Sequence, residues 1–236
     1  MTVTKTADSD AERGPAVAPA PLQQLILDTF AGTVESAAFP CLGAKAVLHR
    51  DTMRSDVFER LGTESAARGI VDGLRAATEE LDGSRLRSYV AFFTEPRATD
   101  ELTFEHLLWR QLQMVHDLDG ASSWDPTVSD DPDSAHFAFS VEGRAYFVVG
   151  LHPGSTRWAR RFAWPALVFN PHAQFEQLRV DGTYDTMRAR IRERDADLQG
   201  TVNPVMADHG QTGEARQYSG RPVGDDWRCP LDVHRP

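Results

Sequence analysis

The sequence predicts a single α/β domain in which a mixed β-sheet is flanked by helices. Three observations lead to this fold class. Residues 86–94 form a continuous apolar run that is typical of a buried strand. Residues 63–81 and 103–118 carry apolar side chains at helical spacing. Glu142-Gly143 separates two strand-like runs and is a strong signal for a β-hairpin.

The first 21 residues differ in character from the rest of the chain. They are polar and rich in proline and alanine, and they lack the central apolar run of a secretory signal. We therefore expect residues 1–21 to form a disordered arm and residues 22–236 to form the domain. No internal repeat or linker divides this domain further.

The elements follow in order from residue 22. Residues 22–30 are expected to form a short amphipathic helix and residues 44–50 a strand. The helix at 63–81 has Thr63 as its N-cap and Asp82-Gly83 as its stop, and the buried strand at 86–94 comes next.

The second half of the domain continues the alternation. Thr103 is expected to cap the helix at 103–118. The remaining predictions are hairpin strands at 136–140 and 144–151, a strand at 166–169, a charged surface helix at 184–198 closed by Gly200, and an irregular tail after Asn203 that wraps the body.

Composition excludes several classes of protein. The chain has 236 residues with 25 basic and 35 acidic side chains, a net charge of −10, and the basic residues are 23 Arg and 2 Lys. This acidity argues against binding to nucleic acid or to an anionic membrane surface. Two cysteines are too few for a disulfide scaffold or a four-thiolate zinc site. No stretch approaches the length of a membrane span, so a cytoplasmic protein with reduced thiols is expected.

Positive charge is concentrated in one part of the chain. Residues 117–142 hold seven acids and no Lys or Arg, whereas residues 154–179 hold four arginines and one acid. Arg157, Arg160 and Arg161 are spaced to share one helical turn and could hold a phosphate, a substrate carboxylate or haem propionates. The alternative is that they form ion pairs with the acidic stretch.

Two histidines enclose this arginine cluster. His152 and His172 each follow directly on a strand-like run and each stands beside a proline. A histidine at the end of a strand can ligate a metal or a haem, act as a general base, or fix a turn as a structural donor. The position of each histidine is compatible with all three roles.

Cys41 lies in the turn Phe39-Pro40-Cys41-Leu42-Gly43 among apolar neighbours. A buried structural thiol is the common explanation for such a cysteine, although a thiolate is also a strong axial donor to haem iron. Cys229 lies in the tail, where packing is the expected role. A disulfide between the two is not expected in a reducing cytosol. The Gly-rich phosphate loop, the G-x-S-x-G elbow and the H-E-x-x-H motif are all missing from the sequence.

Taken together, the motifs of the chain resemble those of the YqcI/YcgG family from about residue 30 to residue 230. The motifs are Phe39-Pro40-Cys41, Trp124-Asp125-Pro126, Ser129-Asp130-Asp131-Pro132, Gly150-Leu151-His152-Pro153, Arg160-Arg161-Phe162, Phe169-Asn170-Pro171-His172 and Glu214-Ala215-Arg216-Gln217-Tyr218-Ser219-Gly220. The joint pattern is much more specific than any one of these motifs.

The resemblance implies a haem-dependent N-oxygenase that hydroxylates a guanidine or amine nitrogen of a small molecule, such as arginine, in biosynthesis. Haem b would be the cofactor, and an electron donor would be a partner. The implied iron ligand is one of His172, His152 and Cys41. The implied cofactor-binding residues are Arg157, Arg160, Arg161, Phe162, Phe169 and Asn170.

The resemblance also implies a site for the substrate. Glu214 and Arg216 in the tail motif would bind the cationic and carboxylate ends of an amino acid, provided that the tail closes over the site. Two alternatives remain. One is a haem-binding or haem-sensing protein without turnover, and the other is a metal-free module that captures an anion with its arginines.

Overall fold

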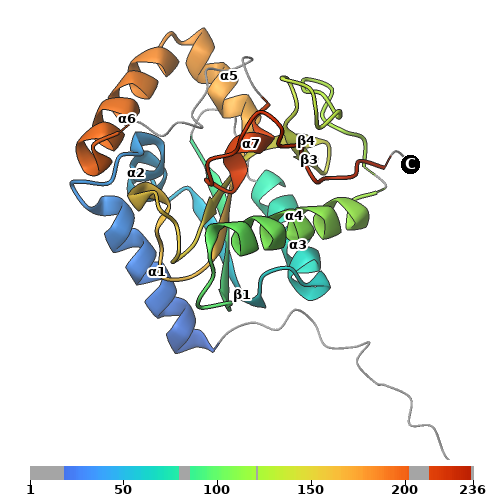
Figure 1. The fold of residues 1–236 in the computed structure, drawn as a ribbon, viewed down its shortest axis with the longest axis horizontal. Helices are drawn as coiled ribbons and strands as arrows, with labels where there is room; N and C mark the ends of the chain where they lie inside the picture. The colour runs from blue at the N-terminus through green and yellow to red at the C-terminus, as the bar shows by residue number, and fades with distance from the viewer. Residues whose placement is uncertain (1–18, 80–85, 121, 202–212, 235–236) are drawn as a thin grey trace, which may run out of the picture.

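A five-stranded mixed sheet with helices on both faces forms the centre of the protein (Figure 1). The computed structural model describes residues 19–79, 86–120, 122–201 and 213–234. This architecture confirms the predicted fold class, a single mixed α/β domain. No helix within these four ranges has the length and apolar character needed to cross a bilayer.

The sheet combines one parallel pair with a set of antiparallel strands. Its order is β1-β2-β5-β4-β3. The strands are β1 (Met53–Arg60), β2 (Ser88–Glu95), β3 (Phe139–Val141), β4 (Arg144–Leu151) and β5 (Ala166–Pro171). β1 and β2 are parallel and are connected through helix α3 (Glu64–Glu79), whereas every other neighbouring pair is antiparallel.

Two layers of helices cover the two faces of this sheet (Figure 1). Helices α3 and α4 (Glu101–Leu118) lie on one face, and α1 (Ala20–Glu35) and α2 (Leu42–His49) lie on the other. Strand β2 shows how one strand serves both layers. Its residues Ala91 and Phe93 belong to the core under α3 and α4, and Phe92, which points the opposite way, packs under α1.

Helices α5 (His172–Val180) and α6 (Tyr184–Gln199) extend the layer that contains α1 and α2 (Figure 1). Between β4 and β5 the chain forms a short 3₁₀ helix, η1 (Trp158–Arg160). Helix α7 (Ala215–Tyr218) is a single turn that packs on β4. These four elements bring the arginine-rich part of the sequence close to the tail.

The tail wraps the body, as the sequence predicts, in the part that the structure describes. Its residues 213–234 run along α4. The buried carboxylate of Glu105 accepts hydrogen bonds from Trp227 Nε1 (2.6 Å) and from Arg221. Further along, the backbone N–H of His234 donates to His116 Nε2 at 3.0 Å. The tail is therefore fixed to α4 near both ends of that helix.

Several element boundaries confirm the sequence predictions. Glu142 and Gly143 have φ values of 53° and 70° and connect β3 to β4 as the expected hairpin. Thr63 precedes α3, and its hydroxyl accepts the Ala66 N–H. Gly200, with φ 78°, ends α6 in the left-handed conformation. The expected stop at Asp82-Gly83 and residues 1–18 of the expected arm lie outside the described residues.

Three predictions about secondary structure were wrong. Residues 44–49 are helical and Arg50 is the C-cap, because Cys41 caps α2 and the helix buries only Val47, which leaves no alternating strand pattern. The N-cap of α4 is Asp100, whose carboxylate accepts the Thr103 N–H at 2.7 Å, so the helix begins before Thr103. Helix α1 begins at Ala20, inside the expected arm. Strand β1 and helix α5 were missed.

Candidate functional site

A cavity of about 300 Å³ lies on the face of the sheet that carries α1 and α2. Its floor is the strands, and α1, α2, α5, α6 and the tail form its walls. The apolar lining consists chiefly of Phe30, Val34, Phe39, Val47, Leu48, Met53, Val90, Phe147, Val149, Leu151, Val168, Phe175, Met187 and Ile191. The polar lining includes Cys41, Arg157, Arg160, Asn170, Asp195 and Glu214. Predominantly apolar walls with a few polar groups are typical of small-molecule sites.

Cys41 brings a sulfur atom to this cavity from the N-terminus of α2. Its Sγ accepts the backbone N–H of Ala44 at 3.4 Å, so the side chain is fixed as the helix cap. Burial raises the pKa of the Cys41 thiol, while the N–H groups of Ala44 and Gly43 and the charge of Arg160 act in the opposite direction. Cys41 and Cys229 are both free cysteines.

Arg160 also lines the cavity. Its guanidinium donates to three backbone carbonyls, those of Gly150, Gln217 and Tyr218, at 3.1–3.3 Å. Burial lowers its pKa to about 10, with nearby Cys41 and Asp195 opposing the shift. Arg160 therefore joins strand β4 to helix α7 at the edge of the cavity, and much of its donor capacity is used within the protein.

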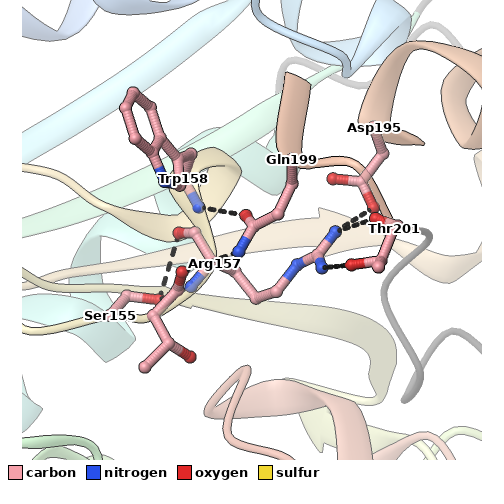
Figure 2. Close-up of polar contacts among 7 residues, drawn as sticks. Ser155, Arg157, Trp158, Asp195, Gln199 and Thr201 are labelled. Carbon is pink, nitrogen blue, oxygen red and sulfur yellow. Dashed lines mark hydrogen bonds and ion pairs between the residues drawn. The ribbon is translucent and has the colours of Figure 1, made fainter. Parts of the chain in front are cut away.

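Arg157 forms an ion pair across the cavity wall (Figure 2). Its guanidinium lies 2.5 Å from the carboxylate of Asp195 in α6, and it also donates to the hydroxyl and the carbonyl of Thr201. Both side chains are about 95% buried. The partner of Arg157 is thus in α6 and not in the acidic stretch 117–142.

Arg161 contacts a different set of residues from the other two arginines. Its Nε donates to the carbonyl of Ser155 at 2.9 Å, and its guanidinium lies 5.6 Å from the ring centre of the exposed Trp158. Arg161 does not line the cavity. The three arginines that are adjacent in sequence therefore do not form one anion site.

The two histidines are at opposite ends of the sheet. His152 follows β4 and His172 follows β5, and these strands are antiparallel, with Leu151 opposite Ala166. Continuing this register places His172 opposite Ala145, seven residues from His152, so at about 3.3 Å per residue the two histidines are roughly 23 Å apart along the strands. Neither histidine lines the cavity. The structure therefore does not bring these two candidate ligands together.

His152 is buried against helix α4. Its ring stacks on Phe104 with 4.2 Å between ring centres, and Nδ1 has no hydrogen-bond partner among the described residues. Burial lowers its pKa to about 4, and the charge of Arg160 acts in the same direction. His152 is therefore neutral at physiological pH.

His172 contacts the tail. Its Nε2 lies 3.2 Å from the Oε1 atom of Glu214, and the imidazole N–H donates to this carboxylate. Burial favours a lower pKa for His172, but the hydrogen bond and the charges of Glu214 and Glu176 outweigh burial, so its pKa is raised. This contact positions Glu214 in the cavity wall. The adjacent Arg216 instead donates to the carbonyls of Gly224 and Trp227, away from the cavity.

The remaining expected cofactor residues are divided among three environments. Asn170 lines the cavity, where it donates to the carbonyl of Phe147 and accepts from the Ser88 hydroxyl. Phe162 packs against Phe30 and Phe92 beside the cavity but does not line it. Phe169 belongs to the core on the opposite face, where it contacts Tyr89 and Tyr146.

Most of the residues that form the cavity carry no motif. Val90, Val149 and Val168 line it because they occupy alternate positions of strands β2, β4 and β5 that face α1 and α2. The alternation of side chains along these strands could have predicted that these valines share a face of the sheet. The sequence does not show which face of the sheet carries the cavity, because this depends on how the strands pair. In the described ranges, no group of three or more His, Cys, Asp or Glu side chains is arranged to hold a metal ion.

Comparison with known proteins identifies one family. No curated protein and no solved structure matches the chain. The model of the YqcI/YcgG family matches residues 30–232, which span nearly all of the fold and every wall of the cavity. The chain therefore belongs to the YqcI/YcgG family.

Proposed function

We propose that this protein binds haem b in the cavity and N-hydroxylates a guanidine or amine nitrogen of a small molecule. The observation that carries the proposal is a single cysteine thiol, Cys41, in the wall of a predominantly apolar cavity. The overall reaction takes the nitrogen compound, O₂, two electrons and two protons to the N-hydroxy product and water. An electron-donor protein supplies the electrons.

The donor set of the cavity fits this cofactor. A bare metal ion needs three or four protein ligands, and the described residues offer no such group. A porphyrin brings four nitrogen ligands of its own, so one axial donor from the protein suffices. Cys41 is the one of the three candidate ligands that lines the cavity, while His152 and His172 have their rings against Phe104 and Glu214.

The protein residues have distinct tasks in this proposal. The bound haem supplies the activation of O₂. Cys41 would ligate the haem iron, and the backbone N–H of Ala44, which already bonds its sulfur, would orient it. The apolar walls exclude water, and Glu214, held by His172, binds the cationic nitrogen group of the substrate. Arg216 has no role in the cavity, so the proposal replaces the two-residue clamp by Glu214 alone.

Replacement of Cys41 tests the ligand assignment. We expect the reconstituted wild-type protein to show the long-wavelength Soret band of a thiolate-ligated haem in its ferrous–CO complex. Cys41→Ala should lose this band and retain haem weakly, whereas His152→Ala and His172→Ala should keep it. Absorption spectra of the four proteins decide the matter. A wild-type protein that remains colourless after reconstitution excludes the haem proposal.

Glu214→Gln tests the substrate site. The substitution keeps the size of the side chain but removes the charge, so we expect KM for a cationic substrate to rise roughly 10- to 100-fold. The haem spectrum should stay unchanged. Glu193→Gln on the exposed side of α6 is the matched control and should leave KM at the wild-type value. Substrate-dependent O₂ consumption is the assay, and its complete absence in wild type would favour a haem-binding protein without turnover.

A further inference from the structure

Three carboxamide side chains line the cavity, and they differ in their contacts with the rest of the protein. Asn170 donates to the carbonyl of Phe147, and Gln174 accepts the backbone N–H of Arg87 at 2.9 Å. The carboxamide of Gln217 makes no hydrogen bond with any residue that the structure describes. A carboxamide left unpaired costs free energy when a ligand displaces the water around it. A ligand that fills the cavity therefore has to offer Gln217 a hydrogen-bond partner.

Helix α7 holds the backbone of Gln217 in place beside strand β4 (Figure 1). Arg160 donates to the carbonyls of Gln217 and Tyr218 at 3.1 and 3.3 Å. The hydroxyl of Tyr218 accepts the backbone N–H of Phe139 at 3.1 Å and donates to the carbonyl of Tyr146 at 3.3 Å. The side chain of Gln217 thus extends from a turn that is tied to β3 and β4, so a ligand need not order this part of the backbone.

Glu214 and Gln217 lie one helical turn apart. The backbone N–H of Gln217 donates to the carbonyl of Glu214 at 2.9 Å, and residues three positions apart lie on the same side of a helix. Both residues line the cavity, and His172 contacts the carboxylate of Glu214. The turn therefore presents one charged and one neutral polar group. The charge attracts any cation, whereas the carboxamide oxygen bonds only to a ligand that carries hydrogen-bond donors.

We propose that Gln217 determines the specificity of the cavity by accepting an N–H of the nitrogen group whose charge Glu214 binds. The position of this nitrogen group at Glu214 rests on the function proposed above. A binding site built to hydrogen-bond its ligand strongly rejects an analogue that leaves the polar groups of the site unpaired. Gln217 thus selects organic cations that carry N–H groups over cations of equal charge without them.

Binding of two cations of equal charge tests this assignment. n-Butylguanidinium carries N–H donors, and n-butyltrimethylammonium has the same alkyl chain and charge but no N–H. We expect Gln217→Met, which keeps the length of the side chain, to bind butylguanidinium roughly 10- to 100-fold more weakly than wild type. It should bind butyltrimethylammonium as tightly as wild type does. Isothermal titration calorimetry of the haem-reconstituted protein measures both affinities without turnover.

Two further variants separate the hydrogen bond from charge and from general damage. Glu214→Gln should weaken the binding of both cations, because it removes the charge. Gln177→Met in α5 is the matched control, since this exposed side chain bonds Asp181 and does not line the cavity. It should match wild type with both cations. If Gln217→Met retains the wild-type affinity for butylguanidinium, or loses affinity for both cations equally, the Gln217 assignment is overturned. Haem uptake and turnover by wild type would then leave the proposed function standing.

The same titrations of the protein without haem separate the remaining outcomes. If wild type takes up no haem but binds butylguanidinium with the expected dependence on Gln217, the Gln217 assignment stands and the haem proposal fails. If wild type binds neither cation, with haem or without it, the Gln217 assignment is overturned whatever the haem spectrum shows.

Discussion

Arg157→Met is expected to weaken the docking of helix α6 by about 3–5 kcal/mol, because it removes one charge of a buried ion pair and keeps the carboxylate of Asp195 buried. The methionine retains the length and apolar volume of the arginine side chain, so packing changes little. Opening of α6 returns Asp195 to water. The cost should therefore appear as a lower free energy of opening for residues 184–199, measured by native-state hydrogen exchange.

Two further variants make this result specific to the buried pair. Arg157→Met/Asp195→Leu removes both charges and should recover most of the lost protection, since an apolar pair of similar volume can replace a buried ion pair. Arg161→Met removes a neighbouring exposed arginine and should leave α6 unchanged. Unchanged exchange of α6 in Arg157→Met would show that the Arg157–Asp195 contact does not hold the helix.

The features of the fold that could be predicted from the sequence depend on local signals. The β3–β4 hairpin follows from Glu142-Gly143, and the end of α6 follows from Gly200, because each conformation is set by the residues themselves. The prediction of a strand at 44–50 failed because the run AKAVLHR suits a strand or a short helix equally. The cap that decides between them is the sulfur of Cys41, a residue outside the usual set of N-caps.

The candidate site could be predicted only in part, because sequence neighbours do not remain neighbours in it. Arg157, Arg160 and Arg161 point to three different partners, since the chain turns through η1 between β4 and β5. His152 and His172 enclose the arginines in the sequence but lie at opposite ends of an antiparallel pair.

Long-range placement also decides which ligand candidate reaches the cavity. Arg160 lies 119 positions after Cys41 in the sequence, but its positive charge acts on the Cys41 thiol in the folded protein. No periodic pattern in the sequence indicates that these two residues lie close together. The chemical types of the site residues are visible in the sequence, but the way the strands pair determines which of them meet.

Acidification is expected to destabilise the protein through His152. Burial places the pKa of His152 at about 4, compared with an ordinary value of 6.5. Between these pH values the unfolded chain binds a proton that the folded protein does not, so stability rises with pH across this window. The contribution of His152 is complete above about pH 6.5 and is lost as the pH falls towards 4. Its size is on the order of 3 kcal/mol, because each unit of pKa shift is worth about 1.4 kcal/mol.

The comparison of pH 7 with pH 4.5 in a single variant isolates this contribution. His152→Leu removes the titrating group from its place beside Phe104, so we expect urea unfolding of the variant to lose less free energy on acidification than wild type does. A loss of packing in the variant lowers stability at both pH values and cancels in the difference. His116, whose pKa burial also lowers, is present in both proteins and cancels as well. The exposed His106→Gln should behave as wild type, and an equal acid loss in His152→Leu would show that His152 titrates normally in the folded protein.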